Sequence, residues 1–447
     1  MSCEFMQELR KLRKLSMESV ENTLSFNTFK KYMHVRRPVE DDLRNMLVHV
    51  NNANKKTLIL LCGSAGDGKS HLLSYLSNAD SDHLLDSFEL YNDATESSAP
   101  SLTSIDTLAV KLSAFDDEHA LEDDGFKMVL AINLGTLNNF IESEQGKRFS
   151  QLKKYVEDNE IFSSYVRPNM YQEDSVFQHV SFSDFQIFTL CEDGVKTTYL
   201  EELLGKIFDQ NEENPFFKAY QTNSTCTLCQ KCPLRHNFEF LFNPVHRKEI
   251  INKIIEVVIK DKAIVSTRDV LNLMYDLLVH PEFNYETFCR VGTSETQYLT
   301  EYIRCTTPML MYELDDVSPL LNAIRNHDIL KDRQAELDLD VTRFHSLENI
   351  YEAFQSATTN TPYAHLNETT RIAVLGGIKP MLKTLVYRFI VRTKEMKGAI
   401  PERSLQKQFH EYIQYLYYQN SGNERKLSKL YEATKKAVMN WDGQFDS

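Results

Sequence analysis

The sequence predicts an α/β protein in which a parallel sheet carries a glycine-rich turn and is followed by a helical region. Two observations support this fold class. An apolar run from Thr57 to Leu61 leads through three glycines into a helical pattern that begins at Lys69. From Pro244 onward, apolar residues recur at three- and four-residue spacing, which is typical of amphipathic helices.

Length and composition set the broad class. The chain has 447 residues, enough for two or three domains, and its 42% hydrophobic and 26% charged residues are ordinary for a soluble protein. No apolar stretch approaches the roughly 20 residues of a membrane helix, and charges stand where a signal peptide needs its apolar region. We therefore expect a cytoplasmic protein without membrane contact. The net charge of −14 means that any DNA contact needs a local basic patch.

Residues 1–50 are expected to form a separate helical segment. Leu9, Leu12 and Leu15 recur at helical spacing, and a second helix follows Pro38. Two arginines before that proline, Arg36 and Arg37, have two interpretations: contact with DNA or a partner, or an ordinary solvated face.

The turn after the first strand carries the strongest motif, since residues 63–70 read GSAGDGKS and satisfy GxxxxGK[ST]. Its glycines let backbone amides point at phosphates, Lys69 can reach the outer phosphates, and Ser70 can provide one Mg²⁺ ligand. The charge of Asp67 is expected to point away from the phosphates. The predicted ATP-contacting residues are Gly63, Ser64, Ala65, Gly66, Asp67, Gly68, Lys69, Ser70 and His71.

Nucleotide hydrolysis would need further polar groups at strand ends. A strand from Phe88 to Asp93 makes Asp93 and Glu96 candidates for holding Mg²⁺ or water, although the usual run of four apolar residues before Asp-Glu is missing. Alternatively, these acids cap the next helix. A buried-type strand, 127–133, ends in Asn133, which can sense a γ-phosphate, position the attacking water or simply bond to its own turn. Another strand is predicted over 185–190.

A cysteine cluster interrupts the predicted nucleotide-binding domain, 51–245, near residues 224–241. Cys226, Cys229 and Cys232 have CxxCxxC spacing, and His236 can complete a tetrahedral zinc site, with His246 a weaker alternative. An iron–sulfur cluster is a second interpretation and three unligated thiols a third. The other cysteines are expected to be core or incidental residues: Cys3, Cys62, Cys191, Cys289 and Cys305.

The remaining chain divides into a helical lid and linker, 246–370, and a basic helical region, 371–447. A capping box at Ser266–Asp269 places Arg268 in the first turn of a helix, from which it can close onto a γ-phosphate or serve as a plain surface arginine. In the last region, Lys383, Arg388 and Arg392 can bind nucleic acid or a partner protein. Alternatively, they lie on the solvated surface of an ordinary helical bundle. The final residues do not form a recognisable chain end, so the sequence leaves open whether the protein continues beyond residue 447.

Together these motifs resemble the DptF family, the ATPase-like components of bacterial DNA phosphorothioation-dependent restriction systems. The likeness spans roughly residues 20–280 and rests on five segments: CGSAGDGKSHLL, YNDATES, AINLGTLNNFIE, CxxCxxCPLRHNFEFL and VSTRDVLNLMYDLLV. It implies work with DptG- and DptH-like subunits in defence against DNA that lacks phosphorothioate marks. By the resemblance, Lys69 and Ser70 match the family's nucleotide loop.

The combined expectation is a P-loop NTPase of the AAA+/STAND type that couples ATP binding or hydrolysis to DNA restriction. The catalytic candidates are Lys69, Asp93, Glu96, Asn133 and Arg268. No nuclease constellation is evident, so DNA cleavage is expected to belong to a partner. The alternative is a nucleotide-gated scaffold that binds ATP without turnover and assembles partner subunits.

Overall fold

The computed structural model describes residues 3–18, 28–92, 103–122, 124–163, 170–182, 187–222, 231–282, 294–315, 317–331, 350–400 and 404–442. Four predicted site residues lie outside these ranges: Asp93, Glu96, Cys226 and Cys229. Within the described ranges, no helix is long and apolar enough to cross a membrane.

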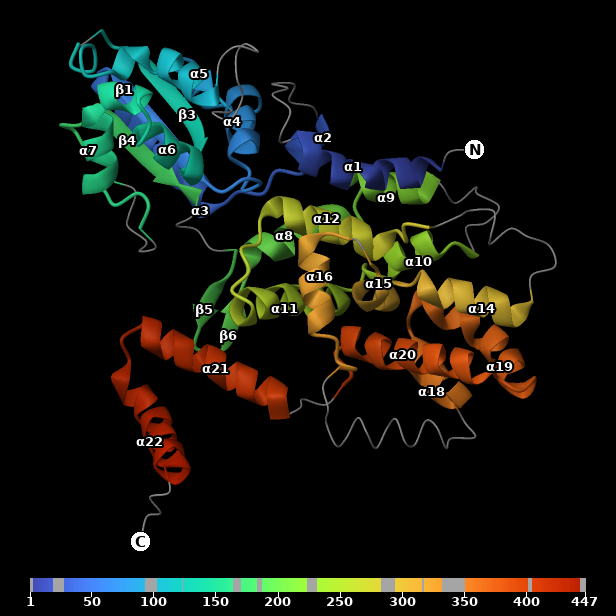
Figure 1. Ribbon diagram of the computed structural model, residues 1–447. Helices are drawn as coiled ribbons and strands as arrows, with labels where there is room; N and C mark the ends of the chain where they lie inside the picture. Colours follow the sequence, from blue (N-terminus) through green and yellow to red (C-terminus); the bar gives the residue numbers. More distant parts are fainter. Residues whose placement is uncertain are drawn as a thin grey trace.

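A four-stranded parallel sheet forms the centre of the α/β part (Figure 1). Its strands are β1 (Thr57–Gly63), β2 (Glu89–Tyr91), β3 (Lys127–Asn133) and β4 (Phe177–Ser181), in the spatial order β2-β3-β1-β4. The sequence-based strands at 57–61, 88–93 and 127–133 are confirmed within one or two residues at each end. Because β1 and β3 pair in register, Gly63 lies opposite Asn133 at the carboxyl edge, where ligands of such sheets bind.

Helices cover both faces of this sheet, because both faces of its central strands are apolar. Leu58, Leu60 and Cys62 of β1 pack on the side of α5 (Ser104–Lys111), α6 (Leu134–Ile141) and α7 (Ser150–Asp158). Ile59 and Leu61 pack on the other side, against α3 (Pro38–Ala53) and α4 (Lys69–Asn78). The result is a three-layer α/β/α arrangement.

The sequence predicts a strand at 185–190, but a different segment, β4, supplies the fourth strand of the parallel sheet. Residues 183–186 lie outside the described part, and β5 (Thr189–Cys191) pairs antiparallel with β6 (Gly194–Lys196) in a separate hairpin. The strand that joins the parallel sheet is β4, which includes the polar residues Gln178 and His179. Gln178 is buried, and its amide bonds to the carbonyls of Gln172 and Ser175, which satisfies a polar group inside an otherwise apolar strand.

The second part of the molecule is helical, and most of its helices share one hydrophobic core, to which the described residues of the last two helices do not belong. Its helices are α1 (Glu4–Glu18), α2 (Thr28–Tyr32), α8 (Thr198–Phe208), α9 (Pro215–Thr222), α10 (Pro233–Phe240), α11 (Pro244–Lys260), α12 (Thr267–Leu278), α14 (Glu295–Arg304), α15 (Thr307–Glu313), α16 (Pro319–Asn326), α18 (Ile350–Thr358), α19 (Asn367–Leu375), α20 (Pro380–Met396), α21 (Ser404–Asn420) and α22 (Glu424–Trp441).

The N-terminal segment 1–50 is shared between the two parts (Figure 1). Phe5, Leu9 and Leu12 of α1 belong to the helical core, whereas α3 packs on the sheet. The chain between them, residues 33–37, therefore crosses from one part to the other beside the turn that follows β1.

The basic helix α20 is part of the helical core, and one of its expected surface cations is buried. Arg392 is 3% exposed and forms ion pairs with Asp328 and Glu313 at 2.8 Å each. Arg388, which is half exposed, also contacts Glu313. Arg392 is therefore engaged inside the fold, which reduces the basic surface predicted for this helix.

Candidate functional site

The loop 63–70 joins the carboxyl end of β1 to the amino end of α4. Gly66 and Gly68 have φ angles of 87° and 96°, which is the left-handed region where glycine alone carries no Cβ penalty. Gly68 is also the N-cap residue of α4, so the backbone amides of the first helical turn open onto the loop. The loop thus has the backbone form that its glycine spacing predicts.

Two side chains of the loop fold back onto its own backbone. Lys69 Nζ donates to the carbonyl oxygens of Ser64 at 2.7 Å and Gly63 at 3.1 Å. The Asp67 carboxylate accepts the Ser64 amide at 2.5 Å. Burial raises the pKa of Asp67, while Lys69 and the Ser64 amide oppose that shift. Lys69 would have to leave these carbonyls to reach a phosphate, and Asp67 holds the start of the loop in shape.

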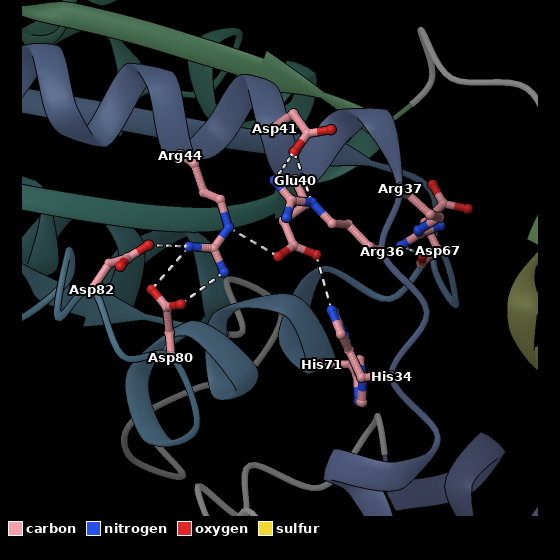
Figure 2. Close-up of polar contacts among 10 residues, drawn as sticks. All are labelled: His34, Arg36, Arg37, Glu40, Asp41, Arg44, Asp67, His71, Asp80 and Asp82. Atoms are coloured by element: carbon pink, nitrogen blue, oxygen red, sulfur yellow. Dashed lines mark hydrogen bonds and ion pairs between the residues drawn. The ribbon is translucent and has the colours of Figure 1, made fainter.

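Arg37, from the segment that crosses between the two parts, contacts this loop (Figure 2). Its Nη2 donates to the Asp67 carbonyl at 2.7 Å, and its guanidinium lies over the rings of Phe182 and Tyr199 at 4.6 and 5.1 Å. Arg37 is therefore not part of an ordinary solvated face, whereas contact of the Arg36–Arg37 pair with DNA or a partner stays a prediction. The exposed Arg36 pairs instead with Asp41.

The first turn of α12 faces the same loop from the helical part. A Cβ added to Gly66 would lie 2.9 Å from Ser266 Oγ and 3.2 Å from the Cβ of Arg268. The predicted capping box is confirmed, since Ser266 accepts the Asp269 amide and Asp269 accepts the Ser266 amide. Arg268 lies in the first turn of this helix, as the sequence predicts, and the fold brings its Cβ close to the 63–70 loop; its action on a phosphate stays a prediction.

At the carboxyl edge, the predicted Mg²⁺ ligand Ser70 lies next to Asn92, which the prediction did not include. Ser70 Oγ donates to the Asn92 carbonyl at 3.5 Å, which brings the end of β2 to the loop. Among the described residues, the Asn92 side-chain Oδ1 is buried without a hydrogen-bond partner. Oxygen atoms of this kind suit Mg²⁺ and its bound water, so these two residues fit such an ion. Sequence reasoning missed Asn92, whose only signal was its place next to Asp93.

Asn133 ends β3, the strand that pairs with β1, from which the 63–70 loop starts. It is the N-cap of α6, and its Oδ1 accepts the Thr136 amide at 2.7 Å. This capping bond corresponds to the alternative in which the asparagine serves its own turn. A role toward phosphate or water would use the Nδ2 group and stays a prediction.

A line of buried polar groups runs from the loop helix to the surface (Figure 2). His71 Nε2 lies 3.3 Å from His34 Nδ1, and His34 Nε2 lies 2.9 Å from Glu40. Arg44 connects Glu40 at 3.0 Å with Asp80 at 2.8 Å. Burial lowers the pKa of His71 to about 3, so its imidazole is neutral at pH 7. Sequence reasoning singled out only His71 of this group.

Three of these residues, His34, Glu40 and His71, also line a cavity between the sheet part and the helical part. The cavity encloses about 90 Å³ beside Gly66 and Gly68. Its apolar lining residues come from the 33–39 segment, α4, α8 and α12: Met33, Val35, Val39, Leu72, Leu203 and Leu271. A flat, largely apolar ring would suit these walls, next to a loop that suits phosphates.

Only two of the four predicted zinc ligands, Cys232 and His236, lie in the described ranges. Cys232 is the N-cap of α10, and His236 lies one turn later, buried, with Nδ1 bonded to the hydroxyl of Tyr302. His246 uses Nδ1 for the Phe240 carbonyl at 2.6 Å, and its Nε2 lies 3.5 Å from Asn243 Nδ2, so His246 stays the weaker alternative. Within the ranges given above, no group of three or more metal-binding side chains is found, and two of the expected ligands lie outside them.

Comparisons of the chain with protein-family models, curated proteins and solved structures found no match.

Proposed function

We propose that this chain is an ATP-binding and ATP-hydrolysing P-loop protein of the AAA+/STAND type. The observation that carries the proposal is the 63–70 loop, which lies at the carboxyl edge of a parallel sheet with Lys69 and Ser70 at the start of the following helix. Amides at a helix start favour phosphate, and the loop composition matches that chemistry.

The surrounding contacts support roles for the chain's own residues. Lys69 would exchange its two carbonyl partners for the outer phosphates, and Arg268 would approach the γ-phosphate from α12. Ser70 and Asn92 would hold Mg²⁺, which neutralises phosphate charge when bound. Asp93 and Glu96 stay the candidates for holding the ion or orienting water.

The setting proposed for this activity is a phosphorothioation-dependent restriction complex with DptG- and DptH-like subunits. Its support is the sequence resemblance alone. In that setting, nucleotide state would control restriction of unmodified DNA, which the chain would contact directly or through its partners.

The second candidate is the scaffold that binds ATP without turnover. One observation favours it, since Asn133 already uses its Oδ1 to cap α6. Glu96→Gln separates the two functions. It should abolish hydrolysis but preserve assembly if the chain is an ATPase, and it should change little if the chain is a scaffold.

The deciding experiment is ATP binding and steady-state hydrolysis by the purified chain, with and without duplex DNA carrying phosphorothioates. Lys69→Ala should remove turnover and weaken binding, whereas the exposed Lys55→Ala serves as the matched control. Binding that ignores Lys69 would contradict the proposed site. Binding without turnover would favour the scaffold.

A further inference from the structure

Helix α22 extends away from the helical part beyond α21, and none of its residues is buried (Figure 1). Apolar side chains nevertheless recur along it at the three- and four-residue spacing of a core-facing helix. We call this set the α22 stripe: Leu427, Leu430, Tyr431, Val438 and Trp441. Trp441, the only tryptophan of the chain, is 91% exposed, and Val438 is 57% exposed. Because a helix with this pattern ordinarily packs its stripe against another element, the α22 stripe is a candidate interaction surface.

The start of α22 is fixed by contacts that leave the stripe open. Asn423 caps the helix by accepting the Lys426 amide. Lys426 lies 3.6 Å from Glu192, in the turn of the β5–β6 hairpin, and over the ring of Tyr418 in α21 at 5.5 Å. These contacts hold the first turn, whereas the stripe from Leu430 onward is exposed.

The charge of α22 is opposite to that of the whole chain. The helix has five basic and two acidic residues, although the net charge of the chain is −14. At about 3.6 residues per turn, Arg425, Lys429 and Lys436 lie on the side opposite the stripe, and Lys435 lies at its edge. An apolar surface bordered by carboxylates complements both the stripe and these cations.

The same features argue against two other occupants of the stripe. A second copy of α22 would bring an equal positive charge to the interface. Duplex DNA would pair with the cations but would leave the leucines, the valine and the tryptophan in water.

The middle of the stripe favours a protein over a lipid surface. Thr434 lies there, between the apolar residues of the first and last turns. A lipid surface would bury its hydroxyl among acyl chains that accept no hydrogen bond, whereas a protein carries acceptors on its backbone and side chains.

We propose that the α22 stripe docks an acidic amphipathic helix of a partner protein, with apolar side chains packed on the stripe and carboxylates facing the lysines. The proposal goes beyond nucleotide binding, because α22 contributes no residue to the candidate nucleotide site. It assigns a surface and a chemistry to a partner contact.

Two synthetic heptad peptides test the proposal on the full chain. Both have leucine at positions a and d; one has glutamate and the other lysine at positions e and g, where like charges keep each peptide from pairing with itself. Neither contains tryptophan, so the emission of Trp441 reports its own surroundings.

The glutamate peptide should move this emission to shorter wavelength and bind at least about tenfold more tightly than the lysine peptide at 0.15 M salt. The test is stringent, because general attraction to this acidic chain favours the lysine peptide. Equal affinities, or no emission shift with the glutamate peptide, would overturn the proposal. A shift with phosphatidylglycerol vesicles alone would assign the stripe to lipid, and a shift with protein concentration alone would assign it to a second copy.

A matched pair of variants tests the stripe itself. Val438→Asp places a charge on the stripe and should weaken the glutamate peptide at least about tenfold. Asn440→Asp adds the same charge two residues later on the opposite side, and the effect should stay below about threefold. Should Val438→Asp unwind the helix, Val438→Gln removes apolar area and keeps a good helix former. Equal binding by the stripe variant and its control would overturn the proposal.

Discussion

Arg37 donates a hydrogen bond from Nη2 to the backbone carbonyl of Asp67 at 2.7 Å. Thirty residues separate the two in the sequence, and the bond ties the segment that crosses between the two parts to the 63–70 loop. Asp67 is thereby held twice, by its carbonyl and by its carboxylate on the Ser64 amide. The loop is shaped in advance of any ligand.

Replacing Arg37 by alanine removes this bond and the contacts with Phe182 and Tyr199. We expect a loss of about 1–2 kcal/mol in the free energy of unfolding and about a tenfold weaker ATP affinity. Urea denaturation and calorimetric titration measure the two effects. Arg36→Ala is the matched control, because its pair with Asp41 is exposed and should contribute less than about 1 kcal/mol.

Variants of Asp67 test whether its hydrogen bond with the Ser64 amide or its negative charge shapes the loop. Asp67→Asn can still accept the Ser64 amide, so the loop should keep its shape and ATP affinity should not fall. Asp67→Ala removes the acceptor, and we expect about a fivefold to tenfold weaker affinity, because an unpaired amide costs about 1 kcal/mol. Equal affinities of the two variants would show that the carboxylate does not shape the loop.

Gly66→Ala tests the closeness of α12 to the loop. The new methyl group would lie 2.9 Å from Ser266 Oγ, in addition to the strain of a φ angle of 87°. Gly377 has a φ angle of 84° and nothing within 4 Å of an added Cβ, so Gly377→Ala measures the backbone strain alone. We expect Gly66→Ala to lose about 1–3 kcal/mol more in stability than this control, and to bind ATP more weakly.

The stability of the sheet part should depend on pH through His179. Burial lowers its pKa to about 4, against about 6.5 in an unfolded chain. The unfolded state therefore binds more protons between these values, and stability is lost as the pH falls from about 6.5 toward 4.

Between pH 7.5 and pH 5.5 this group should cost about 1.4 kcal/mol. His179→Gln should reduce the pH dependence by about that amount, as read from urea midpoints. The interval from pH 7.5 to 8.5 is the control, because histidine does not titrate there. An unchanged slope in the variant would contradict the buried neutral state.

The cysteine cluster predicts a structural metal. Elemental analysis of the purified chain should find close to one zinc per molecule, bound by three cysteines and by the Nε2 of His236, because Nδ1 is engaged by Tyr302. Cys232→Ser should lower the zinc content and the thermal midpoint. Cys62→Ser, at a buried thiol of β1 in the sheet part, is the control for zinc content. Iron with visible absorption would favour the cluster alternative.

The sequence predicted the local elements of this fold well, for a physical reason. The loop 63–70, the strand 127–133 and the capping box at Ser266 depend on glycine spacing, apolar runs and short-range side-chain bonds, and all are encoded within a few neighbouring residues. The strand β4 was missed because its polar residue Gln178 is satisfied by bonds visible only in the folded chain.

Only the tertiary structure decided which side chains meet. It brought Arg37 and Arg268 to the loop from two distant segments, buried Arg392 in ion pairs, and linked His71 through His34 to Glu40. The sequence alone does not show whether a charged side chain lies in solvent or packs against a loop. Its partner is chosen by the packing of distant elements, because desolvation and long-range hydrogen bonds depend on the whole fold.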